Sequence, residues 1–319
     1  MDKNKIVTLV NRSPELVDQH DREGWLNLFS TSAVVEDPVG AGLNRKGKDM
    51  RKGKDALGRF YDIFIAPNSI RFTVHQDIVI GNEMVRDVSI QTVLPNGAVS
   101  VVAAYLIYRI VEEGGQPKIE SLRAHWDFTN NAITLLKKNG FKGTTAATVQ
   151  FATMIKVQGI KRVIEYLGAM YKGIRGKGNK AVAAFAEALN AKDEAALMKL
   201  CDENAIIEFP ASKKVSPKDF FKFAVKDLQI AISGTRSGSW YSSCIFAITG
   251  GGSNSKGVAF FQFNPKTKRI CSARFSSCVR TLISPCASKR CNRRLRRPSA
   301  TISVSALSNW RSSRSSITR

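Results

Sequence analysis

The chain has 319 residues, of which 43% are hydrophobic and 24% charged, proportions typical of soluble globular proteins that exclude a collagen-like chain, a coiled coil and a wholly disordered protein. The longest apolar run, residues 99–108, is much shorter than the ~20 residues that a membrane-spanning helix needs, and the N-terminus leads into no signal-peptide core. We therefore expect a cytoplasmic protein with one large domain or two smaller ones.

The formal net charge of +23 is unevenly distributed along the chain. Residues 1–130 have a net charge of −1, residues 131–275 of +14 and residues 276–319 of +10. Basic segments attract any anionic surface and say nothing about the fold. Contact with nucleic acid or with an anionic membrane, through the basic linker and tail, therefore stays open as a minor alternative.

Residues 1–130 are predicted to form an α+β unit. Apolar side chains recur at helical spacing between Ile6 and Phe29, and a short strand ends at Asp37 before a further helix that begins near Lys54. Turn-forming Gly, Asn and Pro residues separate four longer predicted strands, at residues 70–80, 83–94, 99–111 and 118–128. Such turns favour hairpins, so we expect a curved antiparallel sheet with helices on one face.

A basic amphipathic linker is predicted for residues 131–178. Within it, residues 145–172 repeat apolar side chains at three- and four-residue steps, which indicates a single helix. The other face of this helix carries lysines and an arginine. We expect the helix to pack on one or both neighbouring domains, and insertion into an anionic membrane interface is the alternative.

An internal repeat follows the linker. Leu16–Pro38 aligns with Ala188–Pro210 at a shift of 172 residues, and Ile119–Arg123 resembles Ile270–Arg274. Residues 179–277 are therefore predicted to be a degenerate second copy of the first domain, residues 1–130. The remaining residues, 278–319, contain ten basic and no acidic residues and are predicted to form a disordered Ser/Arg-rich tail.

Asp37 is the strongest candidate for a catalytic residue. A carboxylate at the end of a short apolar strand is partly desolvated, which raises its pKa and makes it a better proton acceptor near neutral pH. The alternative is that Asp37 only caps the turn before Pro38. Phe209 stands at the equivalent position of the second copy, which favours a working site in the first copy alone.

Four segments of the first domain resemble the ketosteroid isomerase and SnoaL-like polyketide cyclase group. They are Trp25–Phe29, Glu36–Gly40, Gly53–Leu57 and Ile119–Trp126. This group is a branch of the nuclear transport factor two-like superfamily, and the resemblance covers about residues 6–128 well and 181–277 faintly. It implies two cone-shaped α+β barrels in tandem, joined by the helical linker, with an apolar pocket.

The resemblance also implies a role for Asp37, because it occupies the position of the base that moves a proton between carbons of an enolisable ketone. The family's oxyanion donors are not retained. Ser13 stands in place of a tyrosine, and there is no aspartate near Tyr105. Candidate substrate-binding residues that could replace these donors are Trp126, Tyr105, Tyr61 and Tyr108.

Strand alternation assigns faces to further residues. Trp126 shares a face with Leu122 and is predicted to line the pocket, whereas His125 points away. Arg86 and Asp87 must point to opposite faces, which counts against an epoxide-hydrolase-like site in which both reach one substrate. In residues 70–80 the same rule gives one apolar face, Phe72, Val74, Ile78 and Ile80, and one polar face, His75 and Asp77.

The preferred hypothesis is that the protein binds a hydrophobic polycyclic or otherwise enolisable ketone and acts as a steroid delta-isomerase-like enzyme or a cyclase. A non-catalytic binding or scaffold protein for small apolar ligands is the main alternative. The second copy is expected to be an intrachain pseudo-dimer partner, with a homodimer as the other option. We expect no metal and no cofactor, and the six cysteines contain no CxxC pair.

Overall fold

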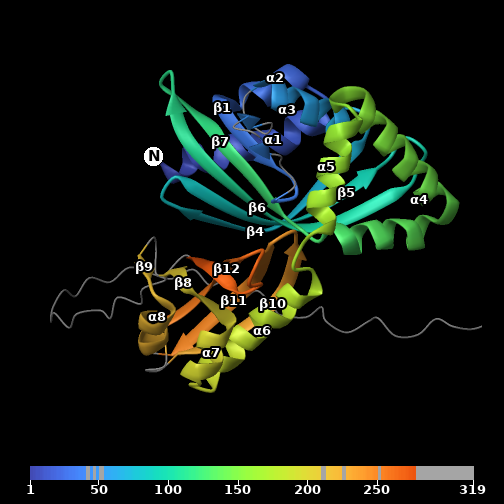
Figure 1. The fold of residues 1–319 in the computed structure, drawn as a ribbon. Helices are drawn as coiled ribbons and strands as arrows, with labels where there is room; N and C mark the ends of the chain where they lie inside the picture. The colour runs from blue at the N-terminus through green and yellow to red at the C-terminus, as the bar shows by residue number, and fades with distance from the viewer. Residues whose placement is uncertain are drawn as a thin grey trace, which may run out of the picture. The chain divides into compact units, whose positions relative to one another are not determined.

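A computed structural model describes residues 1–40, 44–45, 48–49, 54–209, 213–224, 228–250 and 253–277. The tail predicted at residues 278–319 lies outside the described residues. The predicted α+β class is confirmed, because two mixed sheets are each packed with helices (Figure 1). In the described part of the chain, no helix is both long enough and apolar enough to cross a membrane.

The first sheet has the strand order β1-β7-β6-β5-β4. Its long strands are antiparallel neighbours, as the turn residues predicted. The pair β1 and β7 is parallel, however, so the sheet is mixed and not purely antiparallel. The strand bounds are β1 Phe29–Glu36, β4 Ser69–Ile80, β5 Glu83–Val93, β6 Val99–Glu113 and β7 Gln116–His125, and two short strands, β2 Asn44–Arg45 and β3 Lys48–Asp49, pair with each other.

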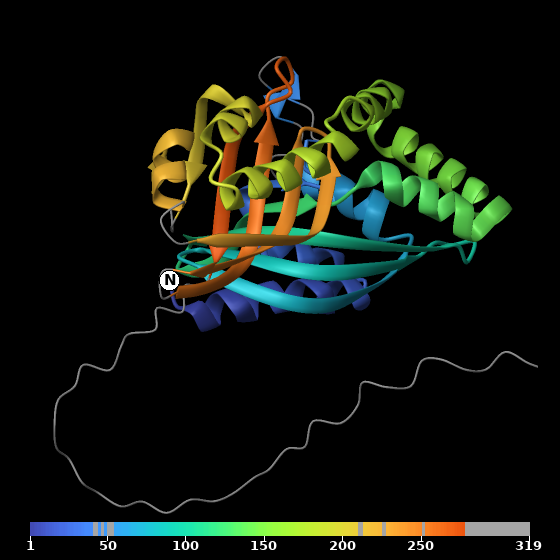
Figure 2. The same ribbon diagram turned by 90° about the horizontal axis from the view of Figure 1, so that it is seen from below.

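Helices α1–α3 lie on one side of this sheet (Figure 1), and its strands curve around α1 (Figure 2). The apolar face of α1 contributes Ile6 and Val10 to a core that includes Trp25 and Leu57. The bounds of these elements are α1 Lys3–Asp18, α2 Arg22–Asn27, α3 Lys54–Phe60 and the π-helical segment η1 Tyr61–Ile65.

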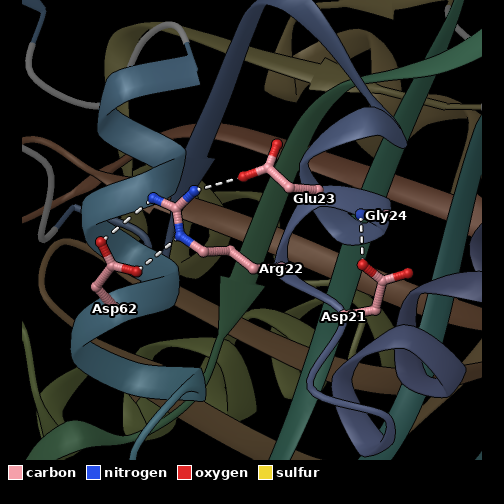
Figure 3. A network of polar contacts seen from close by, with 5 residues as sticks. All are labelled: Asp21, Arg22, Glu23, Gly24 and Asp62. Carbon is pink, nitrogen blue, oxygen red and sulfur yellow. Dashed lines mark hydrogen bonds and ion pairs between the residues drawn. The ribbon is translucent and has the colours of Figure 1, made fainter.

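Polar contacts at the start of α2 hold α2 against η1 (Figure 3). Asp21 caps α2 by accepting a hydrogen bond of 2.8 Å from the Gly24 amide. The Arg22 guanidinium donates to both carboxylate oxygens of Asp62, at 2.9 and 3.3 Å, and also to Glu23. Planar bidentate pairs of this kind fix geometry as well as contributing energy. They therefore help to position the segment that contributes side chains to the candidate site.

A β-bulge at His75 changes the faces predicted for β4. The register between β4 and β5 shifts between Val74 and Gln76, so the alternation of side chains reverses there. Phe72 points to the inner core, but Ile78 is in a separate cluster on the outer face. The prediction that these two residues share a face was therefore wrong. Asp77 faces inward instead and accepts hydrogen bonds from Arg86.

The predicted linker helix is longer than expected and is broken twice. Helix α4 spans Phe128–Gln158 and α5 spans Ile160–Tyr171. Gly140 interrupts α4 with a φ of 52°, and Gly159 separates the helices with a φ of 84°, a conformation that glycine adopts readily. The two helices pack against each other in both views (Figures 1 and 2).

The second sheet has the order β10-β11-β12-β13-β8-β9, which repeats the order of the first sheet with one short edge strand added. The residue register is also repeated. Glu36 is opposite Arg123 in the parallel strands β1 and β7, and Glu208 is opposite Arg274 in the parallel strands β8 and β13. The bounds are α6 Gly176–Asn190, α7 Glu194–Leu200, β8 Cys201–Glu208, β9 Lys214–Val215, α8 Pro217–Ala224, β10 Gln229–Gly238, β11 Tyr241–Gly250, β12 Ser253–Phe263 and β13 Ile270–Ser277.

The outer face of the first sheet contacts the second sheet. Tyr105 and Ile107 are buried in one cluster with Val258 and Phe260. Arg236 lies over the Tyr105 ring at 3.7 Å from its centroid and forms an ion pair of 3.2 Å with Asp87. The first sheet thus uses its two faces differently, the outer one for this contact and the inner one for the core.

Close packing between β12 and β13 allows a test of the second sheet. A Cβ atom at Gly257 would collide with the backbone carbonyl of Ser276, whereas one at Gly168 in α5 would meet no atom. Gly257→Ala is expected to lower stability by about 1–3 kcal/mol. Gly168→Ala should raise it by up to about 1 kcal/mol, because alanine favours helix. Thermal unfolding of both variants checks this, and equal melting temperatures would contradict the described strand pairing.

Candidate active site

A cavity of about 320 Å³ lies against the inner face of the first sheet. Apolar side chains from the sheet, α1, α3, η1, α4 and α5 form most of its wall. Asp37 is the one charged residue among the described residues that line it. The remaining polar lining residues are Ser13, Asn68, Thr92, Ser100, Tyr108, Trp126, Asn131, Gln150 and Tyr166.

Asp37 follows the last residue of β1 and is half-buried. The Trp126 indole Nε1 donates a hydrogen bond of 2.6 Å to Asp37 Oδ1. Burial raises the pKa of Asp37 to about 6, although the hydrogen bond from Trp126 acts in the opposite direction. The carboxyl group can therefore exchange a proton near neutral pH, which is the property that a general base needs.

The parallel pairing of β1 and β7 brings Asp37 and Trp126 together. Glu36 is opposite Arg123 in the register, and the Arg123 Nε donates to Glu36 at 2.7 Å. Beyond this pair, the Val39 amide donates to the Ala124 carbonyl at 2.8 Å. Both contacts flank Asp37, so they fix the turn that presents its carboxylate to the cavity.

Two phenols of the cavity wall lie within electrostatic range of Asp37. Tyr108 comes from β6 and Tyr166 from α5. Burial raises the pKa of Tyr108 to about 12 and also raises that of Tyr166, and the negative charge of Asp37 contributes in both cases. Both hydroxyl groups therefore keep their protons at neutral pH and can donate hydrogen bonds to a ligand.

Arg86 occupies the inner face of β5 beyond Tyr108. It is 2% exposed, and its guanidinium donates to both oxygens of Asp77 at 2.8 and 2.9 Å and to Asn11 of α1. Asp87 points to the outer face, where it pairs with Arg236. The neighbours on β5 thus face opposite sides, as strand alternation predicted. A buried cation that is paired in this way supports the core and does not line the cavity.

Four substrate-binding residues were predicted, and two of them line the cavity, Trp126 and Tyr108. Tyr105 is on the outer face of β6, where its hydroxyl donates to the Gly234 carbonyl at 3.0 Å. The prediction that Tyr105 binds substrate is therefore not supported by its position. Tyr105 and Tyr108 are three residues apart on one strand, and side chains at an odd spacing point to opposite faces of a sheet. Tyr61 does not line the cavity either, and its buried ring packs behind the wall against Trp25.

Helices α4 and α5 contribute residues to the site that were not predicted from the sequence. Asn131, Gln150 and Tyr166 come from these helices, which the sequence indicated only as a linker. Gln150 donates to the Ile63 carbonyl at 3.0 Å, and Asn139 exchanges hydrogen bonds with the Val99 backbone. These contacts attach the two helices to η1 and β6. We call residues 128–171 the α4–α5 cover.

The second sheet treats the equivalent position differently. Phe209 packs against the rings of Phe220, Phe223 and Phe275, with centroid distances of 5.6, 5.7 and 5.7 Å. An aromatic residue packed among other rings therefore stands where the first sheet has the Asp37 carboxylate. His125, on the outer face of β7, packs against Phe260, and burial lowers its pKa to about 3, with Arg123 adding to the effect. A neutral imidazole at the contact between the sheets is not part of the cavity.

The raised pKa of Asp37 leads to a prediction about stability. Its pKa is about 6 in the folded chain and near its ordinary value of 3.8 in the unfolded chain, so the folded state disfavours the ionised form. Asp37→Asn removes this cost while keeping an oxygen that accepts from Trp126. Its melting temperature should be close to that of the wild type at pH 4, and exceed it above pH 6 by the equivalent of about 3 kcal/mol, since each unit of pKa shift corresponds to about 1.4 kcal/mol. A constant difference between pH 4 and pH 7 would contradict the assignment.

Part of the chain is similar to known proteins of solved structure. The chain is similar to the Delta 5-3-ketosteroid isomerase from Mycobacterium sp., at 36% identity over 39% of this chain and 95% of that chain, with a TM-score of 0.35. A Mycobacterium tuberculosis protein in complex with estradiol-17beta-hemisuccinate is 30% identical over 39% and 95% of the two chains, with a TM-score of 0.35. None of the curated proteins matches. Residues 10–119 match the SnoaL-like domain model.

Proposed function

We propose that the chain binds a hydrophobic ketone in the cavity of the first sheet and moves a proton between two carbons of that ketone, with Asp37 as the base. The observation that carries this proposal is one ionisable carboxylate, with a pKa of about 6, on the wall of an otherwise uncharged cavity. A base works best when its pKa is close to the pH at which it acts. The match of residues 10–119 to the SnoaL-like domain model supports the proposal, because it covers Asp37 and most of the first sheet.

In the proposed reaction, the Asp37 carboxylate takes a proton from the carbon between the carbonyl and a carbon–carbon double bond. The electron pair of the broken C–H bond moves toward the carbonyl oxygen, which gives a dienolate. Asp37 then returns the proton to the far end of the dienolate, and the product is a conjugated enone. Because Trp126 donates to Oδ1, we assign the proton transfer to Oδ2.

Stabilisation of the dienolate oxygen is assigned to Tyr108 and Tyr166. A hydrogen-bond donor aimed at a developing oxyanion contributes most where water is excluded, and removal of one such donor typically lowers kcat by about 10²–10³. Both phenols line the cavity, and the charge of Asp37 acts on both. These two residues would replace the tyrosine and aspartate that the ketosteroid isomerase resemblance implies and this chain lacks.

The other parts of the chain have supporting roles in this proposal. We propose that residues 179–277 are a degenerate second copy of residues 1–130, on the basis of the repeated strand order and the equivalent pairs Glu36–Arg123 and Glu208–Arg274. The second copy would act as an intrachain pseudo-dimer partner that covers the outer face of the first sheet. The linker between them, residues 131–178, would close the cavity.

The direct test is the ultraviolet absorbance of the conjugated enone formed from a Δ5-3-ketosteroid. The full-length chain should form the enone, and Asp37→Asn should lower kcat by about 10²–10⁴ because the general base is lost. Tyr108→Phe and Tyr166→Phe should also lower kcat, because each removes a proposed hydrogen-bond donor. Tyr61→Phe is the matched control and should leave kcat unchanged, because the Tyr61 hydroxyl is buried without a hydrogen-bond partner and does not line the cavity. Steroid binding with no turnover in the wild type would favour the ligand-binding alternative.

The pH dependence of this turnover follows from the pKa of Asp37. Only the ionised carboxylate accepts a proton, so kcat/KM should fall about tenfold per pH unit below pH 6 and be constant above it. The initial rate at low substrate concentration between pH 4.5 and pH 8 measures this profile. A rate that is independent of pH down to pH 4.5 would contradict the role of Asp37 as the base.

A further inference from the structure

The α4–α5 cover exposes large apolar side chains on the side that does not face the cavity. Soluble proteins rarely leave such side chains exposed together unless the surface binds something. The exposed fractions are 83% for Phe141, 54% for Val149, 55% for Ile160, 62% for Ile164 and 74% for Tyr171.

Helical spacing puts these residues on continuous faces. In α5, Ile160, Ile164 and Tyr171 recur at steps of four and seven, whereas Val163 and Met170 are buried. In α4, Phe141 and Val149 are exposed, whereas Ala146, which lies between them in the chain, is buried. Both helices therefore have two apolar faces, one that packs against the protein and one that is left without a protein partner among the described residues.

Positive charge accompanies the exposed apolar faces. Residues 131–175 contain eight lysines and arginines and a single acidic residue, Glu165. The lysines of the two helices are all exposed: Lys137, Lys138, Lys142, Lys156 and Lys161. Beyond α5 the basic surface continues into a groove of about 730 Å³. Ten residues line this groove, and they include Lys172, Arg175, Lys177, Lys180 and Lys268 and the aromatic residues Tyr171 and Trp240.

The charge also decides between possible occupants of this surface. A second copy of the chain would bring the same excess of positive charge against it, and residues 278–319 contain ten basic and no acidic residues. Like charges in close contact are unfavourable. The occupant should therefore be both apolar and anionic, which describes the interface of a membrane that contains acidic lipids.

We propose that the α4–α5 cover docks on an anionic membrane, with the exposed apolar side chains in the interface and the lysines at the lipid headgroups. The opposite faces of the same helices contribute Phe151, Met154 and Tyr166 to the cavity. Docking would thus place the wall of the cavity next to the phase in which an apolar ligand dissolves. The proposal goes beyond the proposed reaction and does not depend on it.

Co-sedimentation of the full-length chain with vesicles tests the proposal. We expect binding to vesicles of phosphatidylcholine and phosphatidylserine, and little binding to phosphatidylcholine alone. The double variant Phe141→Ser/Ile164→Ser should reduce the bound fraction at least about fivefold, because it removes two residues of the interface. Val101→Ser is the matched control, since Val101 is 53% exposed on β6, outside the α4–α5 cover.

Charge variants and competitors separate this surface from other basic parts of the chain. Lys156→Glu/Lys161→Glu should weaken binding, whereas Lys3→Glu in α1 should leave it unchanged. Unchanged binding by the apolar double variant would overturn the proposal and assign the contact to other basic residues. Displacement by millimolar inorganic phosphate would also overturn it, because the basic groove would then hold a free anion. Asp37→Asn should bind vesicles like the wild type, so failure here is distinct from failure of the proposed reaction.

Discussion

The hydrogen bond between Trp126 and Asp37 lies at the centre of the candidate site, because it holds an ionisable carboxylate in an apolar cavity. Burial alone would favour the protonated acid, and the indole donor partly offsets this effect. The balance leaves a carboxyl group that titrates near pH 6. The parallel pair β1–β7 supplies this geometry, since the ends of the two strands present Asp37 and Trp126 side by side.

The same strand order leads to different interiors in the two sheets. In the first sheet, α4 and α5 complete the wall of a cavity that contains Asp37. In the second, Phe209 stands at the position that corresponds to Asp37 and packs against Phe220 and Phe275. Close packing stabilises a core, whereas a cavity leaves apolar side chains with fewer contacts and lowers stability. The described structure is consistent with one sheet that carries a site and another that supports it through the contact at Tyr105 and Arg236.

The sequence was sufficient for features that depend on local pattern. The repeat predicted from Leu16–Pro38 aligns residues that have the same register in both sheets, and alternation placed Trp126 at the cavity and His125 away from it. The faces of β4 were predicted incorrectly, because a bulge at His75 adds one residue without a signal in the hydrophobic pattern. Tyr166 could not be assigned to the cavity from the sequence. Helical periodicity predicts that one face of a helix is buried, but it does not predict which part of the protein that face contacts.

The most direct measurement of the central claim is the titration of the Asp37 carboxyl group itself. Carbon-13 NMR of a chain labelled at the aspartate side-chain carbons, with Asp37→Asn to identify the resonance, gives its midpoint without a substrate. A midpoint near pH 6 is predicted from burial in the cavity. A midpoint near pH 4 would show that water solvates the carboxylate, and it would contradict both the buried site and the role of Asp37 as a base at neutral pH.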